Sequence, residues 1–173
     1  YWDRVHRAEY AIFGQPFIAV PCLVRRPGEL DMTCVDWEWT ERVIVFSSSY
    51  LKGAFADRCI AKGALNLHVG IAPEYRGSAP NMWAEYDVRW DLIGAQVQGL
   101  SRGLDAGEIL AETRVPPGGD YFTRGMQAVR QGIAALVTLL ATPEPWWPVR
   151  ENNRANQLRY SKHADFTESV AAE

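Results

Sequence analysis

His68 is the residue best placed for acid–base chemistry among the three histidines of the chain. It lies on the polar face of residues 65–71, where apolar and polar side chains alternate as in a half-buried strand. An imidazole there can act as a general base when a carboxylate orients its ring, and the candidate carboxylates are Glu85, Asp87 and Asp91. The alternative is a half-buried histidine whose ring nitrogens make only structural hydrogen bonds.

The other candidate catalytic groups have simpler structural explanations. The three serines at 47–49 follow a predicted strand, where nucleophiles and anion-binding amides often lie, but serine also caps helices. His6 and Glu9 stand one helical turn apart near a chain end, where side chains are usually exposed and mobile. His163 lies in a polar segment and is expected to be solvated. These residues therefore predict no metal site.

Motifs that bind nucleotides or activate a catalytic serine are absent from the sequence. There is no G-x-x-x-x-G-K-[ST], no G-x-G-x-x-G, no G-x-S-x-G and no H-E-x-x-H. Cys22, Cys34 and Cys59 form no C-x-x-C pair and lie in apolar or strand-like stretches. We therefore expect no cofactor and no metal, and we expect buried free thiols, which fit a cytoplasmic, reducing compartment.

Composition places the chain among globular proteins of about one domain. It has 173 residues, of which 47% are hydrophobic and 23% are charged. The net charge of −3 argues against direct nucleic-acid binding, which usually needs a basic face. No apolar stretch is long enough to span a bilayer, and the first residues lack the apolar core of a signal peptide, so we expect no membrane contact.

Hydrophobic periodicity predicts one α+β domain over residues 1–142. A mainly antiparallel sheet would form from strands at 17–24, 32–40, 42–47 and 65–71. A short helix is expected within 50–64, between two glycines. Residues 82–112 fit a helix and a strand equally well, so the sequence predicts neither there.

The clearest predicted element is a helix over residues 120–142, which would begin at the N-cap Asp120 and end before Pro143. Its apolar residues recur every three or four positions and would pack across the sheet. A second stripe of small residues includes Gly125 and Gly132, which let another backbone come close. That backbone could belong to the chain's own sheet or to another subunit.

Residues 143–173 are predicted to form a polar arm, because they hold too few apolar residues to build a core. The arm begins with Trp146 and Trp147 among three prolines, and such a rigid aromatic pair is typical of binding hot spots. The pair could instead fold back onto the helix end. Further spaced anchors in the arm are Leu158, Tyr160, Phe166 and Val170.

These features favour a non-enzymatic assembly protein that binds neighbouring subunits through the helix face and the arm, as a homo- or hetero-oligomer. A viral or phage capsid or connector component, within an intracellularly assembled particle, would use such surfaces. The alternative is a small hydrolase or transferase with His68 as general base and Glu85 or Asp87 as its partner. The nearest carboxylate to His68, and an open polar pocket beside it, discriminate between the two hypotheses.

Overall fold

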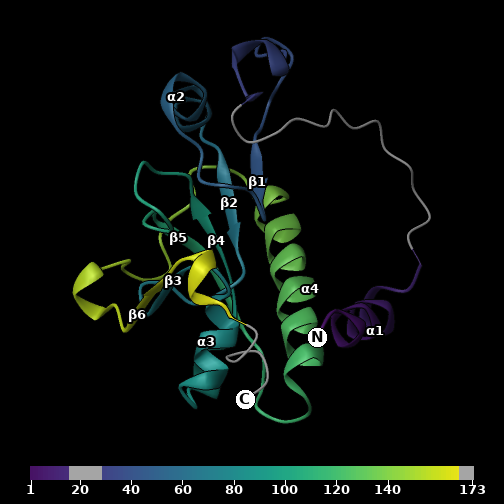
Figure 1. The fold of residues 1–173 in the computed structure, drawn as a ribbon. Coiled ribbons are helices and arrows are strands. Elements are labelled where there is room, and N and C mark those ends of the chain that lie inside the picture. Colours follow the sequence, from purple (N-terminus) through teal and green to yellow (C-terminus); the bar gives the residue numbers. More distant parts are fainter. Residues whose placement is uncertain (16–28, 168–173) are drawn as a thin grey trace.

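The computed structural model describes residues 1–15 and 29–167, and its centre is a four-stranded sheet with the order β1-β2-β4-β5 (Figure 1). The strands are β1 (Ile44–Phe46), β2 (Leu65–His68), β4 (Gly94–Gly99) and β5 (Ile109–Arg114). β1 and β2 run parallel, and the other two pairs are antiparallel. The fold is therefore α+β with mainly antiparallel pairing, as the sequence predicted.

Four α-helices and a second, two-stranded sheet complete the part of the chain that the structure describes. The helices are α1 (Trp2–Phe13), α2 (Gly53–Ala61), α3 (Pro80–Tyr86) and α4 (Tyr121–Leu140). Short 3₁₀ turns are η2 (Met32–Cys34), η3 (Trp90–Leu92), η4 (Arg154–Asn156) and η5 (His163–Asp165). In the second sheet β3 (Tyr75–Gly77) pairs in parallel with β6 (Arg159–Ser161). No helix within residues 1–15 and 29–167 is long and apolar enough to cross a membrane.

Several elements follow the hydrophobic periodicity of the sequence. The strands predicted at 42–47 and 65–71 are β1 and β2, and the helix predicted within 50–64 is α2. The helix predicted at 120–142 is α4, and the side chain of its N-cap Asp120 accepts hydrogen bonds from two backbone N–H groups of the first turn. The strand predicted at 17–24 lies outside the described residues. The division into a domain and an arm at residue 142 stays a prediction.

The predicted strand at 32–40 is wrong, because this region folds into the turn η2 followed by further turns. The Asp31 carboxylate accepts a hydrogen bond from the Thr33 N–H at 2.8 Å. The Asp36 carboxylate accepts another from the Glu38 N–H at 3.2 Å. Such local bonds between side chain and backbone offer an alternative to pairing in a sheet, and here they prevail over the alternation of apolar residues.

The region 82–112, which periodicity left open, contains the end of α3, the turn η3, the strand β4 and the start of β5. α3 has Pro80 at its first position, where the missing N–H costs nothing. The Asn81 side chain then joins α3 to β4, since its amide donates to Gly94 O at 2.9 Å and accepts from Gly94 N–H at 3.0 Å. Residues 82–112 contain parts of both a helix and strands, so neither helical nor strand periodicity prevails over the whole region.

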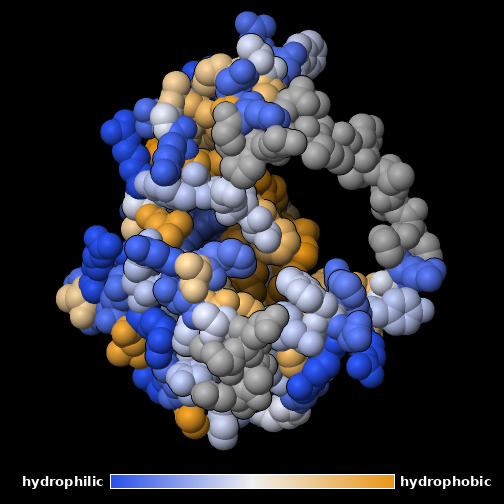
Figure 2. All heavy atoms as spheres, viewed as in Figure 1, coloured by the Kyte–Doolittle hydropathy of each residue, from blue (hydrophilic) through white to orange (hydrophobic). Residues whose placement is uncertain are grey.

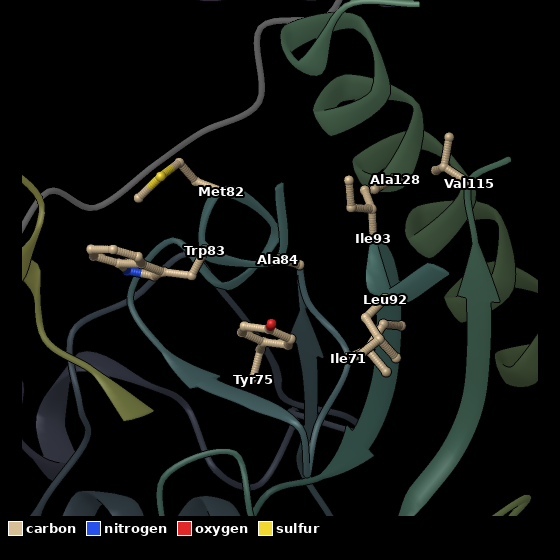
Figure 3. Packing of buried hydrophobic residues seen from close by; sticks show 9 residues of the cluster. All are labelled: Ile71, Tyr75, Met82, Trp83, Ala84, Leu92, Ile93, Val115 and Ala128. Atoms are coloured by element: carbon tan, nitrogen blue, oxygen red, sulfur yellow. The ribbon is translucent and has the colours of Figure 1, made fainter. Parts of the chain in front are cut away.

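Two apolar clusters hold the layers together. One lies between α4 and the sheet and contains Leu65, Leu67, Ala95, Val97 and Leu136. The other, drawn in Figure 3, lies where α3 and the start of β4 meet α4, and it contains Ile71, Tyr75, Met82, Trp83, Ala84, Leu92, Ile93, Val115 and Ala128. Because side chains alternate along a strand, the polar residues of β2 and β4 lie on the sheet face opposite α4.

Gly132 lies where α4 comes very close to the sheet. A Cβ at this position would stand 2.7 Å from Ala95 Cβ and 3.0 Å from Leu67 Cδ1. A Cβ at Gly125, by contrast, would meet no atom within 4 Å. The small-residue stripe therefore packs against the chain's own sheet at Gly132.

We predict that Gly132→Ala lowers the free energy of unfolding by about 1–3 kcal/mol, because the methyl group overpacks the contact between helix and sheet. The matched control Gly125→Ala should be neutral or stabilising, since alanine gains roughly 1 kcal/mol of helix propensity over glycine. Urea denaturation of both variants measures the difference. Equal effects of the two substitutions would contradict this packing.

Candidate active site

His68 and Asp105 form an ionisable pair at the centre of the candidate site. Nδ1 of His68 lies 3.2 Å from Oδ1 of Asp105, and the two side chains are only 6% and 8% exposed. His68 ends β2, while Asp105 lies in the connection between β4 and β5. A carboxylate therefore orients the His68 ring, although it is not one of the three that the sequence analysis named.

The three carboxylates expected beside His68 bind cations elsewhere: Glu85 pairs with Arg124, Asp87 with Arg159 and Asp91 with Arg89. Asp87 also accepts a hydrogen bond from the Tyr75 hydroxyl at 3.0 Å. Burial and the Asp87 carboxylate raise the pKa of Tyr75 to about 12. The expectation about Glu85 and Asp87 fails because this stretch forms α3 and the turn after it, rather than a strand beside β2.

Three donors surround the Asp105 carboxylate. Besides the contact with His68, Oδ1 accepts a hydrogen bond from Asn66 Nδ2 at 3.3 Å, and Oδ2 accepts one from the Gly77 N–H at 2.9 Å. Burial by itself would raise the pKa of Asp105. The charge and hydrogen bond of His68, with the bonds from Gly77 and Asn66, outweigh burial and lower this pKa below its usual value.

Both ring nitrogens of His68 face an oxygen. Nδ1 faces the Asp105 carboxylate, and Nε2 lies 3.2 Å from the backbone carbonyl of Tyr75. A neutral imidazole can donate only one hydrogen bond, whereas the protonated ring can donate to both oxygens at once. The surroundings of His68 can thus accommodate a ring that has taken up a proton.

An ordered row of amides lies beside the pair on β4. Gln96 Oε1 accepts from the Ala72 N–H at 3.0 Å, and Gln96 Nε2 donates to Ala72 O at 2.8 Å and to Glu112 at 2.7 Å. Gln98 Nε2 donates to Gln96 Oε1 at 2.8 Å. These partners fix both amide orientations and leave Gln98 Oε1 as a buried acceptor without a donor.

A cavity of about 1030 Å³ opens beside these polar groups. Its polar wall holds Asn66, His68, Gln98 and Asp105, while its apolar lining includes Phe13, Phe46, Met126 and Val129. α1, β1 and α4 thus all contribute side chains to one cavity. Figure 2 shows hydrophobic residues gathered around the middle of α4 on the face in view. A cavity with an apolar lining and a few convergent polar groups is typical of small-molecule sites.

Other polar candidates from the sequence lie at the same cavity. Residues 47–49 line it, and they do not cap α2, because that helix begins only after Lys52. His163 lines the cavity from the turn η5. Glu9 also lines it, whereas His6 is exposed on α1, where its ring lies 6.5 Å from that of Trp2.

Asn66 and Asp105 were not among the site residues predicted from the sequence. Asn66 precedes His68 by two residues, so the alternation of β2 already placed both side chains on one face. Asp105 carried no comparable signal, because only the pairing of β2 with β4 brings the β4–β5 connection beside His68.

The residues predicted to bind a partner lie in varied surroundings. Trp146 packs against the cluster between α4 and the sheet, and its indole N–H donates to Thr142 O at 3.0 Å. Phe166 packs against the other cluster. Gly132 packs on the sheet, and Gly125 lines the cavity. The exposed members of the set are Trp147, Leu158 and Tyr160. Their role in binding a partner stays a prediction.

The chain shares the fold of solved formyltransferases. A 4-N formyltransferase from Francisella tularensis matches with a TM-score of 0.59 and 17% identity, over 72% of this chain and 50% of that one. The formyltransferase PseJ from Anoxybacillus kamchatkensis, solved with UDP-4,6-dideoxy-4-formamido-L-AltNAc and tetrahydrofolate, matches with a TM-score of 0.55 and 21% identity, over 82% of this chain and 75% of that one.

Curated proteins similar to the chain in sequence are also formyltransferases. Methionyl-tRNA formyltransferase from Bordetella petrii is 34% identical over 95 residues, which are 49% of this chain and 29% of the relative. The match thus spans less than a third of that relative's length. No family model matches the chain.

These similarities overturn the interpretation of the chain as a non-enzymatic assembly protein or a viral or phage particle component. Proteins similar to it in sequence and in fold are formyltransferases, so they indicate an enzyme. The transferase alternative agrees with them. The polar arm misled the sequence analysis, because a segment that cannot form its own core can still pack on the rest of its own chain.

We predict that Asp105→Asn lowers the free energy of unfolding at pH 7 by about 1–3 kcal/mol, since it leaves His68 without its charged partner. The folded pKa of Asp105 is lowered, so its contribution is fully present above the unfolded pKa of about 3.9. It is lost as pH falls through the folded pKa. Denaturation from pH 7 to pH 3 should therefore show the wild type losing its advantage over the variant.

A suitable control is Asp57→Asn, which removes a half-exposed carboxylate that pairs with Arg102 at 3.0 Å. This substitution should change stability by less than about 1 kcal/mol. An Asp105→Asn variant as stable as Asp57→Asn at pH 7 would show that the buried pair does not stabilise the fold.

Proposed function

We propose that the chain carries the catalytic site of a formyltransferase, which moves a formyl group from a tetrahydrofolate donor to an amine. The observation that carries this proposal is the buried cluster of Asn66, His68 and Asp105 on the wall of a large cavity. The similarity in sequence and fold to formyltransferases supports the same reaction, and PseJ was solved with tetrahydrofolate. The proposal therefore rests on the chemistry of the buried cluster and on the similarity to formyltransferases.

The cavity fits a donor of this chemistry. A pterin ring is flat and partly apolar, and the lining offers Phe46, Met126 and Val129. Residues 47–51 also line the cavity, and their backbone and hydroxyl groups are candidates for hydrogen bonds to the edge of such a ring. The unpartnered Gln98 Oε1 is a further acceptor close to the polar wall. When bound, the donor would supply a formyl carbon attached to nitrogen.

In this transfer a bond forms between the acceptor amine and the formyl carbon, and the bond from that carbon to the donor nitrogen breaks. The amine loses one proton, and the donor nitrogen gains one. The N–H of the Asn66 side-chain amide that Asp105 does not use can stabilise negative charge on the formyl oxygen, while the His68 ring acts as the base for the amine proton. Such preorganised donors in a buried site usually give the largest single contribution to catalysis.

Asp105 has two tasks in this mechanism. Its carboxylate orients the His68 ring through Nδ1, and its lowered pKa keeps it ionised at neutral pH. His68 can therefore take up the proton that the amine loses, because the ionised Asp105 carboxylate compensates the positive charge that the ring gains. The free thiols of Cys34 and Cys59 lead us to expect this reaction in a reducing compartment.

We predict that the purified chain transfers formyl from formyltetrahydrofolate to a member of a panel of amines, including amino sugars and aminoacylated tRNA. His68→Ala should reduce the rate about 10²- to 10⁴-fold, because it removes the general acid–base group. Mass spectrometry of the acceptor, with absorbance of the released folate, measures the transfer.

The matched control is His6→Ala, since His6 is exposed on α1 and is expected to take no part in the reaction. It should retain the wild-type rate. If both substitutions leave the rate unchanged, or if the wild type formylates none of these amines, the proposed function is wrong.

A further inference from the structure

The chain returns to the catalytic pair after α4. Residues 150–161, which we call the return segment, contact the β2–β3 loop that directly follows His68 and the β4–β5 connection that carries Asp105. Arg150 donates to Ala72 O at 2.7 Å and pairs with Glu74, in the loop between β2 and β3. At the other end β6 pairs with β3, and Ser161 Oγ donates to Ser78 O at 2.6 Å. The segment is thus fixed at both ends.

Asn152 lies inside the return segment and reaches the loop that carries Asp105. Its Nδ2 donates to the backbone carbonyl of Asp105 at 3.0 Å and to that of Gly107 at 2.7 Å. Its Oδ1 accepts from Arg76 Nη2 at 2.6 Å. The two carbonyls can only accept and the guanidinium can only donate, so these neighbours define the orientation of the amide.

The backbone of Asp105 needs such support. Asp105 has a φ of 47°, in the left-handed region that costs a non-glycine residue about 1–2 kcal/mol. Residues in such conformations persist when surrounding bonds over-determine them, and they gather at functional sites. Here the side chain of Asp105 is held by His68, Asn66 and Gly77, while its carbonyl is held by Asn152.

The same contacts connect Asn152 with β3. Arg76 lies on β3 and is only 3% exposed. It forms no ion pair with a carboxylate among the described residues, so the side chain of Asn152 is a main partner of its guanidinium. The next residue, Gly77, donates its N–H to Asp105 Oδ2. The Asn152 side chain therefore connects β3 with the β4–β5 connection. The distance between these two segments sets the position of the Asp105 carboxylate.

We propose that Asn152 is a positioning residue for the formyl transfer: it holds the Asp105 loop in its strained conformation, so that the carboxylate stays aligned with His68 and Asn66. This inference rests on the proposed function for its kinetic consequence. Its structural part, the alignment of Asp105 with Gly77, stands on the hydrogen bonds of Asn152 alone. Asn152 acts through Asp105, so its loss should affect turnover more than substrate binding.

Asn152→Asp is the sharpest test, with Asn153→Asp as its matched control. An aspartate at 152 keeps the size of the side chain and its acceptor for Arg76, but it can no longer donate to the carbonyls of Asp105 and Gly107. An aspartate at 153 adds the same charge one residue along the chain. It also keeps the acceptor that Asn153 offers to the Ala155 N–H at 2.9 Å.

The expected kinetic result is a loss of kcat on the order of 10-fold or more in Asn152→Asp, because a small misplacement of a catalytic group is costly. The KM for formyltetrahydrofolate should stay within about twofold, and Asn153→Asp should match the wild type in both constants. Asn152→Ala adds no charge and should show the same loss of kcat. This second variant keeps the proposal testable if Asn152→Asp fails to fold.

Amide hydrogen exchange gives a readout that does not need activity. In the Asn152 variants the Gly77 N–H should exchange faster, because its acceptor on Asp105 is no longer held, while the buried amide of Val97 on β4 should keep its rate. Wild-type kcat and wild-type Gly77 exchange in both Asn152 variants would overturn the proposal. If the wild type transfers no formyl group, the proposed function fails, and Gly77 exchange alone decides whether Asn152 positions Asp105.

Discussion

The buried contact between His68 and Asp105 is the constraint on which the rest of the structure depends. An ionised carboxylate loses hydration when only 8% of its side chain is exposed, and it is tolerated only where a charge and donors replace water. His68, Asn66 and the Gly77 N–H provide this replacement from two separate elements, β2 and β3. The fold must therefore hold these elements in register with the β4–β5 connection.

The two faces of the sheet differ in character, since one packs against α4 and the other carries buried polar groups. Leu65, Leu67 and Val97 pack against α4, and this packing fixes β2 and β4. The intervening residues of the same strands place Asn66, His68 and the two glutamines on the opposite face, where hydrogen bonds satisfy nearly every buried polar atom. The exception is Gln98 Oε1, an unpaired acceptor among the residues that line the cavity. Such an exception is expected where a ligand completes the hydrogen bonding.

The polar segment after α4 packs on its own chain over the residues that the structure describes, and its role in binding a partner stays a prediction. Its arginines, asparagine and β6 bind the loops that follow β2 and β4, and they bring His163 to the cavity. A segment with few apolar residues can be ordered through hydrogen bonds and ion pairs when a preformed surface offers partners. Composition alone does not distinguish this intramolecular role from binding to another protein, which explains why the sequence analysis favoured assembly.

The sequence by itself determined the α+β class, β1, β2, α2, α4 and the place of His68 on the polar face of β2, because each depends on a local hydrophobic period or on neighbours within a few residues. It could also have indicated Asn66, which shares the polar face of β2. Only the tertiary structure selected Asp105 over Glu85 and Asp87 as the partner of His68, since that choice depends on the pairing of β2 with β4. It likewise decided where Asn152 binds, because contacts between residues distant in sequence leave no periodic signal along the chain.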